Sequence, residues 1–321
     1  MPRLESGILR FAQDDVQRGR AHTALAVTTG EILRFATERA AAAGSDATAW
    51  DARLLLAHSL GGLSPLALDP RQEHDEALSA RFFGLWDRRV AGEPVQHLIG
   101  EWDFYGRTFR VDRRALVPRP ETEILVEQAL RAAPDASRVL DAGTGSGIIA
   151  ITYLLEKVDA TALALDISLD ALALARENAV RHGVLGRLSL VASDWLSALG
   201  GVSFDLVLSN PPYLAIGESP HLPPTVRDHD PRRALFAGDD GMAAIRQLLA
   251  SVPAVLGPGG LLVFEIGFGQ SEAVRSEILT RPAWRFVGIE DDLEGIPRIC
   301  LVRRESPAER VGRIRKPWTS S

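Results

Sequence analysis

Apolar residues recur at the spacing of α-helices in the first third of the chain. The pattern begins at Thr28, which forms a capping-box motif with Glu31, a common start of a helix. It predicts three helices, over about 28–44, 46–61 and 75–91. The apolar face of the second is expected to consist of Trp50, Leu54, Ala57 and Leu60. We therefore predict a small helical domain over residues 28–92, preceded by a poorly ordered extension over residues 1–27.

Between Pro94 and Pro118 the pattern becomes typical of strands. Residues 104–109 place aromatic and polar side chains on both sides of Gly106, which favours a tight hairpin. We predict that residues 93–117 form a β-hairpin linker between two domains.

From residue 118 to 304, short apolar runs alternate with helical segments. The predicted strands are Arg138–Ala142, Ala162–Asp166, Leu188–Ala192, Phe204–Ser209 and Leu261–Ile266. Helices are predicted near 147–157, 168–182, 240–256 and 270–280. This alternation predicts an α/β fold, with a mostly parallel sheet that is covered by helices on both faces. The last apolar segments, 284–290 and 298–302, are expected to pair antiparallel at one edge because no helix separates them.

The overall charge argues against one class of function. Lys and Arg number 36 against 42 Asp and Glu, and the net charge of −6 argues against a protein that coats nucleic acid. Residues 305–321 are locally basic; we expect a passive tail, and the alternative is a segment that attracts an acidic partner surface.

A single cysteine, Cys300, excludes an intramolecular disulfide and a cysteine-rich zinc site. The seven histidines show no ligand spacing, so no metal is expected. No apolar run is long enough to span a bilayer, and the N-terminus lacks the pattern of a secretory signal. The sequence thus predicts a soluble, cytoplasmic protein.

A glycine-rich turn joins the first strand of the α/β segment to an apolar helix. It consists of Gly143, Thr144, Gly145, Ser146 and Gly147. Glycines let the backbone pass close to a ligand and aim the N–H groups of the helix at it. The pattern favours a ligand-binding loop over a tight turn without a ligand.

Polar residues stand at the end of the second predicted strand and directly after the third. Asp166 is placed to accept hydrogen bonds from both hydroxyls of a ribose, and the alternative is a cap for the next helix. Asp194 is placed to meet an adenine amine, while Trp195 offers a flat face to the base or simply packs.

The most specific motif is Asn210-Pro211-Pro212-Tyr213, after the fourth strand. Two prolines fix the backbone, so the carbonyls of Asn210 and Pro211 are presented as acceptors. Together with the side-chain oxygen of Asn210 they predict a site for an NH₂ group, whose lone pair then points at an electrophile. Tyr213 is expected to stack on a planar substrate and to face a sulfonium cation.

These motifs resemble those of the S-adenosylmethionine-dependent release-factor glutamine methyltransferases, the HemK/PrmC family. The resemblance covers about residues 28–303 and includes the segments 100–106, 118–123 and 295–298. Ala142 and residues 228–231 depart from the commoner pattern, so the resemblance does not assign which side chains of 215–241 close over the substrate.

The resemblance implies a class I, Rossmann-like methyltransferase sheet in residues 118–304 and a helical domain that docks the substrate. It also implies transfer of a methyl group from S-adenosylmethionine to the glutamine amide in the Gly-Gly-Gln loop of class 1 peptide-chain release factors. By similarity, residues 143–147 hold the methionine end, Asp166 the ribose, Trp195 the adenine side, and residues 210–213 the glutamine. No general base is required, and Asp205 and Glu265 are expected to be structural.

Three alternatives remain open from the residues. One is methylation of an exocyclic base amine in DNA or RNA, which is weakened because residues 28–92 hold seven arginines against nine carboxylates. The second is methylation of a glutamine in a ribosomal protein. The third is a binding module for adenosine or a dinucleotide with no activity, against which the intact motif at Asn210 argues.

Overall fold

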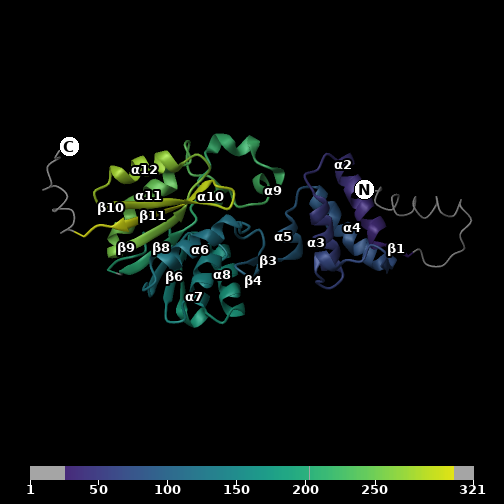
Figure 1. Ribbon diagram of the computed structural model, residues 1–321, viewed down its shortest axis with the longest axis horizontal. Helices are drawn as coiled ribbons and strands as arrows, with labels where there is room; N and C mark the ends of the chain where they lie inside the picture. Colours follow the sequence, from purple (N-terminus) through teal and green to yellow (C-terminus); the bar gives the residue numbers. More distant parts are fainter. Residues whose placement is uncertain (1–25, 202, 307–321) are drawn as a thin grey trace, which may run out of the picture. The chain divides into compact units, whose positions relative to one another are not determined.

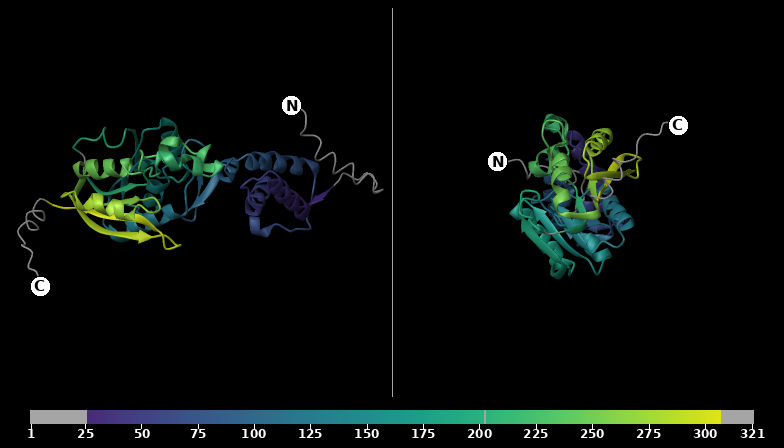
Figure 2. Two further views of the ribbon diagram at one scale, coloured as in Figure 1. Left: turned by 90° about the horizontal axis from the view of Figure 1, so that it is seen from above. Right: turned by 90° about the vertical axis from the view of Figure 1, so that its left-hand side faces the viewer.

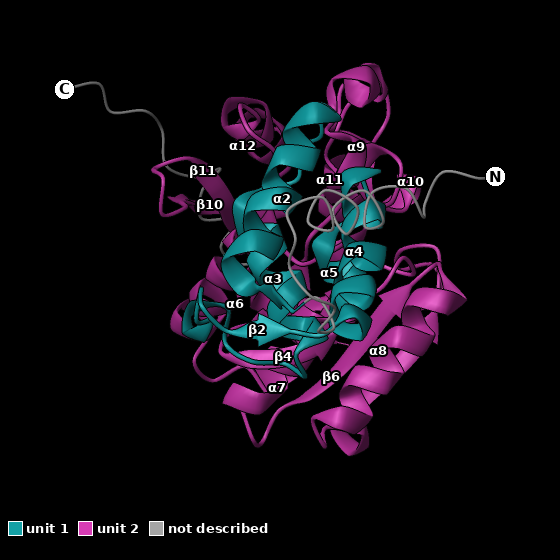
Figure 3. Cartoon of the chain, turned by 90° about the vertical axis from the view of Figure 1, so that its right-hand side faces the viewer, with its two compact units in different colours: residues 1–99 teal, residues 100–321 magenta. Residues whose placement is uncertain are grey.

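The computed structural model describes residues 26–201 and 203–306. The predictions for the extension before residue 26 and for the tail after residue 306 lie outside the described residues. The chain divides into two compact units, Met1–Ile99 and Gly100–Ser321, which are coloured separately in Figure 3.

The first unit is helical, with one short strand pair. Its helices are α2 (Thr29–Ala42), α3 (Ala49–Ser59), α4 (Glu76–Val90) and α5 (Val95–Ile99), with a 3₁₀ turn at Pro65–Ala67. Strands β1 (Val27–Thr28) and β2 (Glu73–His74) pair antiparallel. The predicted capping box at Thr28 is confirmed, because its side chain accepts from the backbone N–H of Glu31 and the Glu31 side chain returns to Thr28.

The predicted apolar face of α3 is confirmed at Ala57 but is wrong at Trp50. Trp50 is 46% exposed, whereas the helix buries Asp51, Ala52, Leu55, Leu56 and Ala57. Trp50 is exposed because of the polar partners of Asp51. The Asp51 carboxylate accepts the backbone N–H of Thr48, the cap of the helix, and pairs with the buried Arg89 at 3.0 Å. This pairing turns Asp51 inward, and Trp50 is left on the exposed side.

The second unit holds a seven-stranded sheet in the order β10-β11-β9-β8-β5-β6-β7 (Figure 1). Its strands are β5 (Arg138–Ala142), β6 (Thr161–Asp166), β7 (Leu188–Ala192), β8 (Phe204–Ser209), β9 (Leu256–Glu265), β10 (Trp284–Asp291) and β11 (Pro297–Arg304). Strands β5 to β9 pair parallel, and β10 and β11 add an antiparallel edge. The predicted α/β fold and the antiparallel edge pair are both confirmed.

Helices cover both faces of this sheet, as Figures 1 and 2 show. One core cluster includes apolar residues of α6 (Glu121–Ala132) and α7 (Ile148–Glu156), and α8 (Leu169–Arg181) packs on the same side. The other includes residues of α11 (Ala243–Ser251) and α12 (Ser271–Leu279). Among the described residues, no helix combines the length and apolarity that crossing a bilayer requires.

Two elements near the boundary between the units differ from the sequence expectation. Residues Val95–Ile99, which were expected to be strand-like, are helical, and α6 was not predicted. The hairpin itself is confirmed as β3 (Glu101–Phe104) and β4 (Arg107–Arg110). Its turn carries Tyr105 at a positive φ of 52°, and Glu123 of α6 accepts the Tyr105 N–H at 2.8 Å.

The strand order reverses between β5 and β8. The connection after β5 leads outward to β6 and β7, and β8 returns to the other side of β5. In parallel sheets such a switch point leaves a crevice at the carboxyl ends of the two strands. The glycine-rich turn follows β5 and the Asn210 motif follows β8, so both predicted motifs meet at this crevice.

Candidate active site at the carboxyl edge of the sheet

A cavity of about 640 Å³ lies at this edge, within the usual size range for small-ligand sites. Of the site residues expected from the sequence, those that line it are Gly143, Thr144, Gly145, Ser146, Asp166, Asp194, Trp195, Asn210, Pro211 and Pro212. Gly147 and Tyr213 are not among its lining residues. The structure therefore gathers the two motifs around one space.

The glycine-rich turn is fixed largely by its own strand neighbours. The N–H groups of Gly143 and Thr144 both donate to the carbonyl of Leu165 on β6, at 2.9 and 2.8 Å. Gly147 caps α7 at a φ of 79°, and a Cβ there would lie 2.9 Å from the Cβ of Ala175 on α8. At Gly143, by contrast, a Cβ would meet nothing within 4 Å. Gly147 thus serves packing, and Gly143 leaves room at the cavity.

Asp141, on β5, holds the glycine-rich turn and the start of α7 by hydrogen bonds. It is fully buried, and its Oδ2 accepts the Thr144 hydroxyl at 2.6 Å and the Ala150 N–H at 3.3 Å. Its Oδ1 finds no hydrogen-bond partner in the described structure. Burial raises the pKa of the Asp141 carboxyl to about 7, against the opposing effect of these two hydrogen bonds.

Asp166 organises the turn from the neighbouring strand. Its Oδ2 accepts the Gly145 N–H at 2.9 Å, and its Oδ1 accepts the Ser168 N–H at 2.8 Å. The cap of α8 is Ser168, whose hydroxyl accepts the Ala171 N–H. The capping alternative for Asp166 is therefore wrong, and each of its carboxylate oxygens keeps further acceptor capacity at the cavity wall.

Trp195 adopts a φ of 50°, which is uncommon for a bulky residue. Its side chain is partly buried against the core cluster that contains residues of α11, and it also lines the cavity. The packing interpretation of Trp195 is confirmed, whereas its role as a flat face for a base stays a prediction.

The motif after β8 is tied to two other elements. Ser209 donates its hydroxyl to the carbonyl of Ala142 at 2.7 Å, which joins the ends of β8 and β5. The side-chain NH₂ of Asn210 donates to the hydroxyl of Thr122 at 3.2 Å. Tyr213 donates its hydroxyl to Oε1 of Glu265 at 3.3 Å. The expected stacking of Tyr213 on a substrate stays a prediction.

Glu265, at the end of β9, is only 2% exposed. Its Oε2 accepts the Thr122 hydroxyl at 2.8 Å. Burial raises the pKa of the Glu265 carboxyl to about 7, and the hydrogen bonds from Thr122 and Tyr213 oppose this rise. Asp205 has the structural place expected for it, because its Oδ2 accepts the N–H groups of Ser137 and Arg138 where β5 begins.

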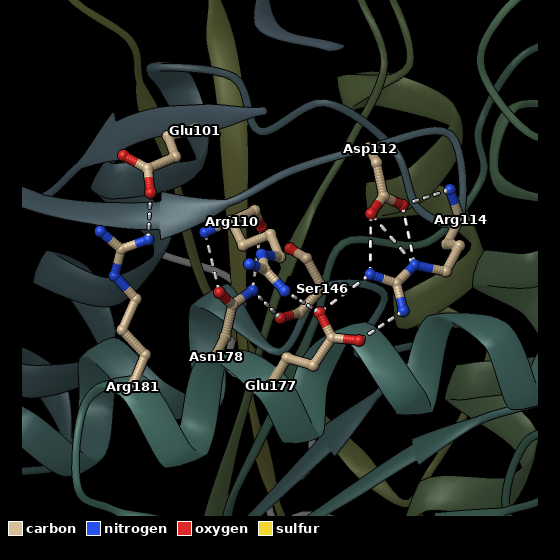
Figure 4. A network of polar contacts seen from close by, with 8 residues as sticks. All are labelled: Glu101, Arg110, Asp112, Arg114, Ser146, Glu177, Asn178 and Arg181. Atoms are coloured by element: carbon tan, nitrogen blue, oxygen red, sulfur yellow. Dashed lines mark hydrogen bonds and ion pairs between the residues drawn. The ribbon is translucent and has the colours of Figure 1, made fainter. Parts of the chain in front are cut away.

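Ion pairs and hydrogen bonds join residues 110–114, which precede β5, to α8 (Figure 4). Arg114, which lines the cavity, pairs with Asp112 at 2.7 Å and with Glu177 at 2.8 Å. Hydrogen bonds from Arg114 and Arg110 lower the pKa of the Glu177 carboxyl to about 2. Asn178 joins this wall to the turn, because its NH₂ donates to the carbonyls of Arg110 and Ser146.

Several lining residues were not expected from the sequence. They are Arg114, Ala115 and Leu116 before β5, Ile148 and Ile149 of α7, Leu165, Ile167, Ser168, Ala171 and Ser193, and Ala243, Ala244 and Gln247 of α11. Other lining residues lie in segments that the sequence singled out: Pro118 and Thr122 in 118–123, and Pro231, Arg232, Arg233, Ala234, Phe236, Ala237 and Gly238 in 215–241. The bridge between Leu214 and Phe236 returns the long segment after Tyr213 to the cavity. The resemblance indicated that part of 215–241 closes over the substrate. Because an irregular segment carries no hydrophobic period, the individual residues that line the cavity could not be chosen from the sequence.

Within residues 26–201 and 203–306, no group of three or more His, Cys, Asp or Glu side chains is placed to hold a metal ion.

Comparison with known proteins identifies both parts of the chain. The family described as the methyltransferase small domain matches residues 120–221, and the PrmC N-terminal domain matches residues 31–100. A release factor glutamine methyltransferase from Cereibacter sphaeroides is 46% identical, over 85% of this chain and 97% of the relative. Proteins of the same name from Nitratidesulfovibrio vulgaris and Caulobacter vibrioides are 41% and 42% identical, over 94% and 88% of their own lengths and 85% and 78% of this chain.

Proposed function

Since the chain belongs to the release factor glutamine methyltransferase family, we propose that it methylates the glutamine side-chain amide in the Gly-Gly-Gln loop of class 1 peptide-chain release factors. The methyl donor is S-adenosylmethionine. The observation that carries the proposal is the meeting of two motifs at one cavity: the glycine-rich turn after β5 and Asn210-Pro211-Pro212 after β8.

The residues at the turn fit the cofactor. Gly143 leaves open space where a side chain would stand, and the Asp166 oxygens retain acceptor capacity for the hydroxyls of a ribose. Asp194 and Trp195 form the part of the wall that suits the adenine. When bound, the cofactor supplies a methyl group on a positively charged sulfur, and this chain's residues orient the acceptor toward it.

The acceptor amide is held by Asn210 and Pro211. Their backbone carbonyls are fixed by the two prolines, and the side-chain oxygen of Asn210 is the third acceptor. An amide NH₂ that donates both hydrogens to such acceptors turns the face of its nitrogen to the methyl group. Because the methylated, cationic amide loses its proton readily to water, the residues that orient the nitrogen supply the catalysis.

The direct test is to incubate the protein with labelled S-adenosylmethionine and a purified release factor, and then to locate the methyl group by mass spectrometry. The proposal expects it on the side-chain nitrogen of the glutamine in the Gly-Gly-Gln loop. Label on a ribosomal-protein glutamine, or on a base amine of added DNA or RNA, would contradict the proposed substrate.

A substitution tests the assignment of the amide site. Asn210→Ala removes the side-chain acceptor but leaves the glycine-rich turn intact. We expect the transfer rate to fall by about 10²-fold or more, with cofactor affinity retained. Equilibrium binding of S-adenosylmethionine to both proteins provides the control, and equal loss of binding and rate would show a structural role instead.

A further inference from the structure

One chain of hydrogen bonds connects three elements behind the amide site. It runs from the Asn210 side-chain NH₂ to the Thr122 hydroxyl at 3.2 Å, and from that hydroxyl to Oε2 of Glu265 at 2.8 Å. Tyr213 donates to the other Glu265 oxygen. Thr122 and Glu265 are 3% and 2% exposed, so water has little access to this chain.

The donors and acceptors in this chain can be ordered in only one way while Glu265 is ionised. A carboxylate accepts and cannot donate, so the single hydrogen of the Thr122 hydroxyl points at Glu265. The Thr122 oxygen then offers only its lone pairs to Asn210. Asn210 must present its NH₂ to Thr122, and its Oδ1 faces the other way.

We propose that Thr122 and Glu265 are positioning residues, which hold the Asn210 amide in the one orientation that presents Oδ1 as an acceptor to the substrate NH₂. This inference rests on the proposed function, because it concerns the same site. It also gives a role to the segment 118–123, which the sequence singled out, and it replaces the purely structural role expected for Glu265.

Packing alone does not supply this orientation. The two ends of an asparagine amide have nearly the same size, so a flipped Asn210 would fit the same space. A flipped side chain would aim two N–H groups at a substrate that itself offers N–H groups, and the acceptor would be lost. Only a hydrogen-bond partner of fixed polarity can distinguish the two orientations.

The charges around Glu265 come from several elements. Arg298 of β11 favours the ionised form, whereas Glu121 of α6 opposes it. The nearby Tyr213 is itself kept protonated, because burial and Glu265 raise the pKa of its hydroxyl. Tyr213 therefore remains a donor, and Glu265 has donors on both of its oxygens as long as it is a carboxylate.

The first test compares Thr122→Val with Thr122→Ser. Valine keeps the shape of threonine but removes the hydroxyl, whereas serine keeps the hydroxyl. We expect Thr122→Val to lower kcat by about 10²-fold while KM for the release factor and the Kd for S-adenosylmethionine stay within about twofold. Thr122→Ser is expected to keep kcat within about threefold of the wild type, because the serine hydroxyl preserves the hydrogen bonds to Asn210 and Glu265.

The second test uses Glu265→Gln, which is similar in shape but can donate from its NH₂. If that NH₂ faces Thr122, the hydroxyl turns toward Asn210 and the amide flips. We expect kcat to fall by at least about 10-fold with the melting temperature at pH 8 not lowered, because a buried charge has been removed. Loss of rate without loss of stability is not what a merely structural residue would give.

The outcomes separate this inference from the proposed function. A wild-type enzyme that methylates the release factor, together with a fully active Thr122→Val variant, overturns the inference and leaves the proposed function intact. Loss of cofactor binding and of melting temperature in step with kcat also overturns it. A wild-type protein that methylates no amide overturns the proposed function and the inference with it.

Discussion

Two buried carboxyl groups near the site, Asp141 and Glu265, both have a raised pKa. Asp141 lies beneath the cofactor turn and Glu265 behind the amide site, and burial raises the pKa of each to about 7. Near neutral pH both are therefore close to the point where they change charge, and a small change in their surroundings decides which form is present.

This condition predicts a pH-dependent rate. As pH falls through about 7, Glu265 gains a proton, becomes a donor and no longer fixes the Thr122 hydroxyl, so kcat should fall. The pH–rate profiles of the wild type and Glu265→Gln check this. We expect kcat of the wild type to fall below pH 7, and kcat of the variant to fall less over the same range. Any fall in kcat that remains in the variant belongs to other groups such as Asp141. Superimposable profile shapes would contradict the prediction.

Stability responds to the same proton in the opposite sense. The folded-state pKa of Glu265 is raised above the ordinary value of 4.5, so its contribution to stability is fully present below 4.5 and is lost as pH rises through about 7. Acid pH within this window thus favours the fold at this residue while it disfavours catalysis. Melting temperatures at pH 5 and pH 8, compared between the wild type and Glu265→Gln, measure the difference.

At the scale of elements, regular patterns were predicted well. The boundaries of β5, β7 and β8 agree with the sequence prediction, because short apolar runs followed directly by glycine, serine or asparagine are clear signals. Helix α6 was missed although Pro120 precedes two glutamates and an apolar stripe, since the segment was interpreted only as a motif.

The candidate site was predictable in part for the same reason. Residues at the end of a strand or directly after it, such as Asp166 of β6 and Asn210 after β8, are placed by the strand itself. Thr122 and Glu265 contact the site from elements far apart in sequence, and the partner of a buried glutamate is decided by tertiary packing. No local pattern could show that contact.

The turn before α7 offers a matched pair of substitutions. Gly147 and Gly143 have nearly equal φ values of 79° and 77°, so alanine brings similar backbone strain at both. Only at Gly147 does the new Cβ lie 2.9 Å from Ala175. We expect Gly147→Ala to cost about 1–3 kcal/mol more stability than Gly143→Ala, measured by denaturant unfolding. Equal losses would contradict the packing role of Gly147.

At the scale of the whole molecule, the chain is two compact units, each with its own buried residues. The cavity is lined wholly by residues of the second unit. No residue of the first unit is among those lining residues, and we propose that this unit, which matches the PrmC N-terminal domain, docks the protein substrate.

Removal of residues 1–99 tests this division of labour. Because the second unit has its own core, the shortened chain should bind S-adenosylmethionine with a Kd close to that of the full chain. Methylation of the release factor should fall by about 10-fold or more through a higher KM. A full rate of release-factor methylation by the shortened chain would contradict the docking role.

The chain of hydrogen bonds behind the amide site also bears on how the protein is made. Asn210 is 88 residues from Thr122 in sequence, and Thr122 is 143 residues from Glu265. The hydrogen bonds of the glycine-rich turn join residues that are closer in sequence, with Gly145 and Asp166 only 21 residues apart. During synthesis from the N-terminus, the turn and its strands can therefore assemble first, whereas the amide site must wait for β9 to emerge. A nascent chain at that stage would hold the parts for the methyl donor before it could accept a glutamine.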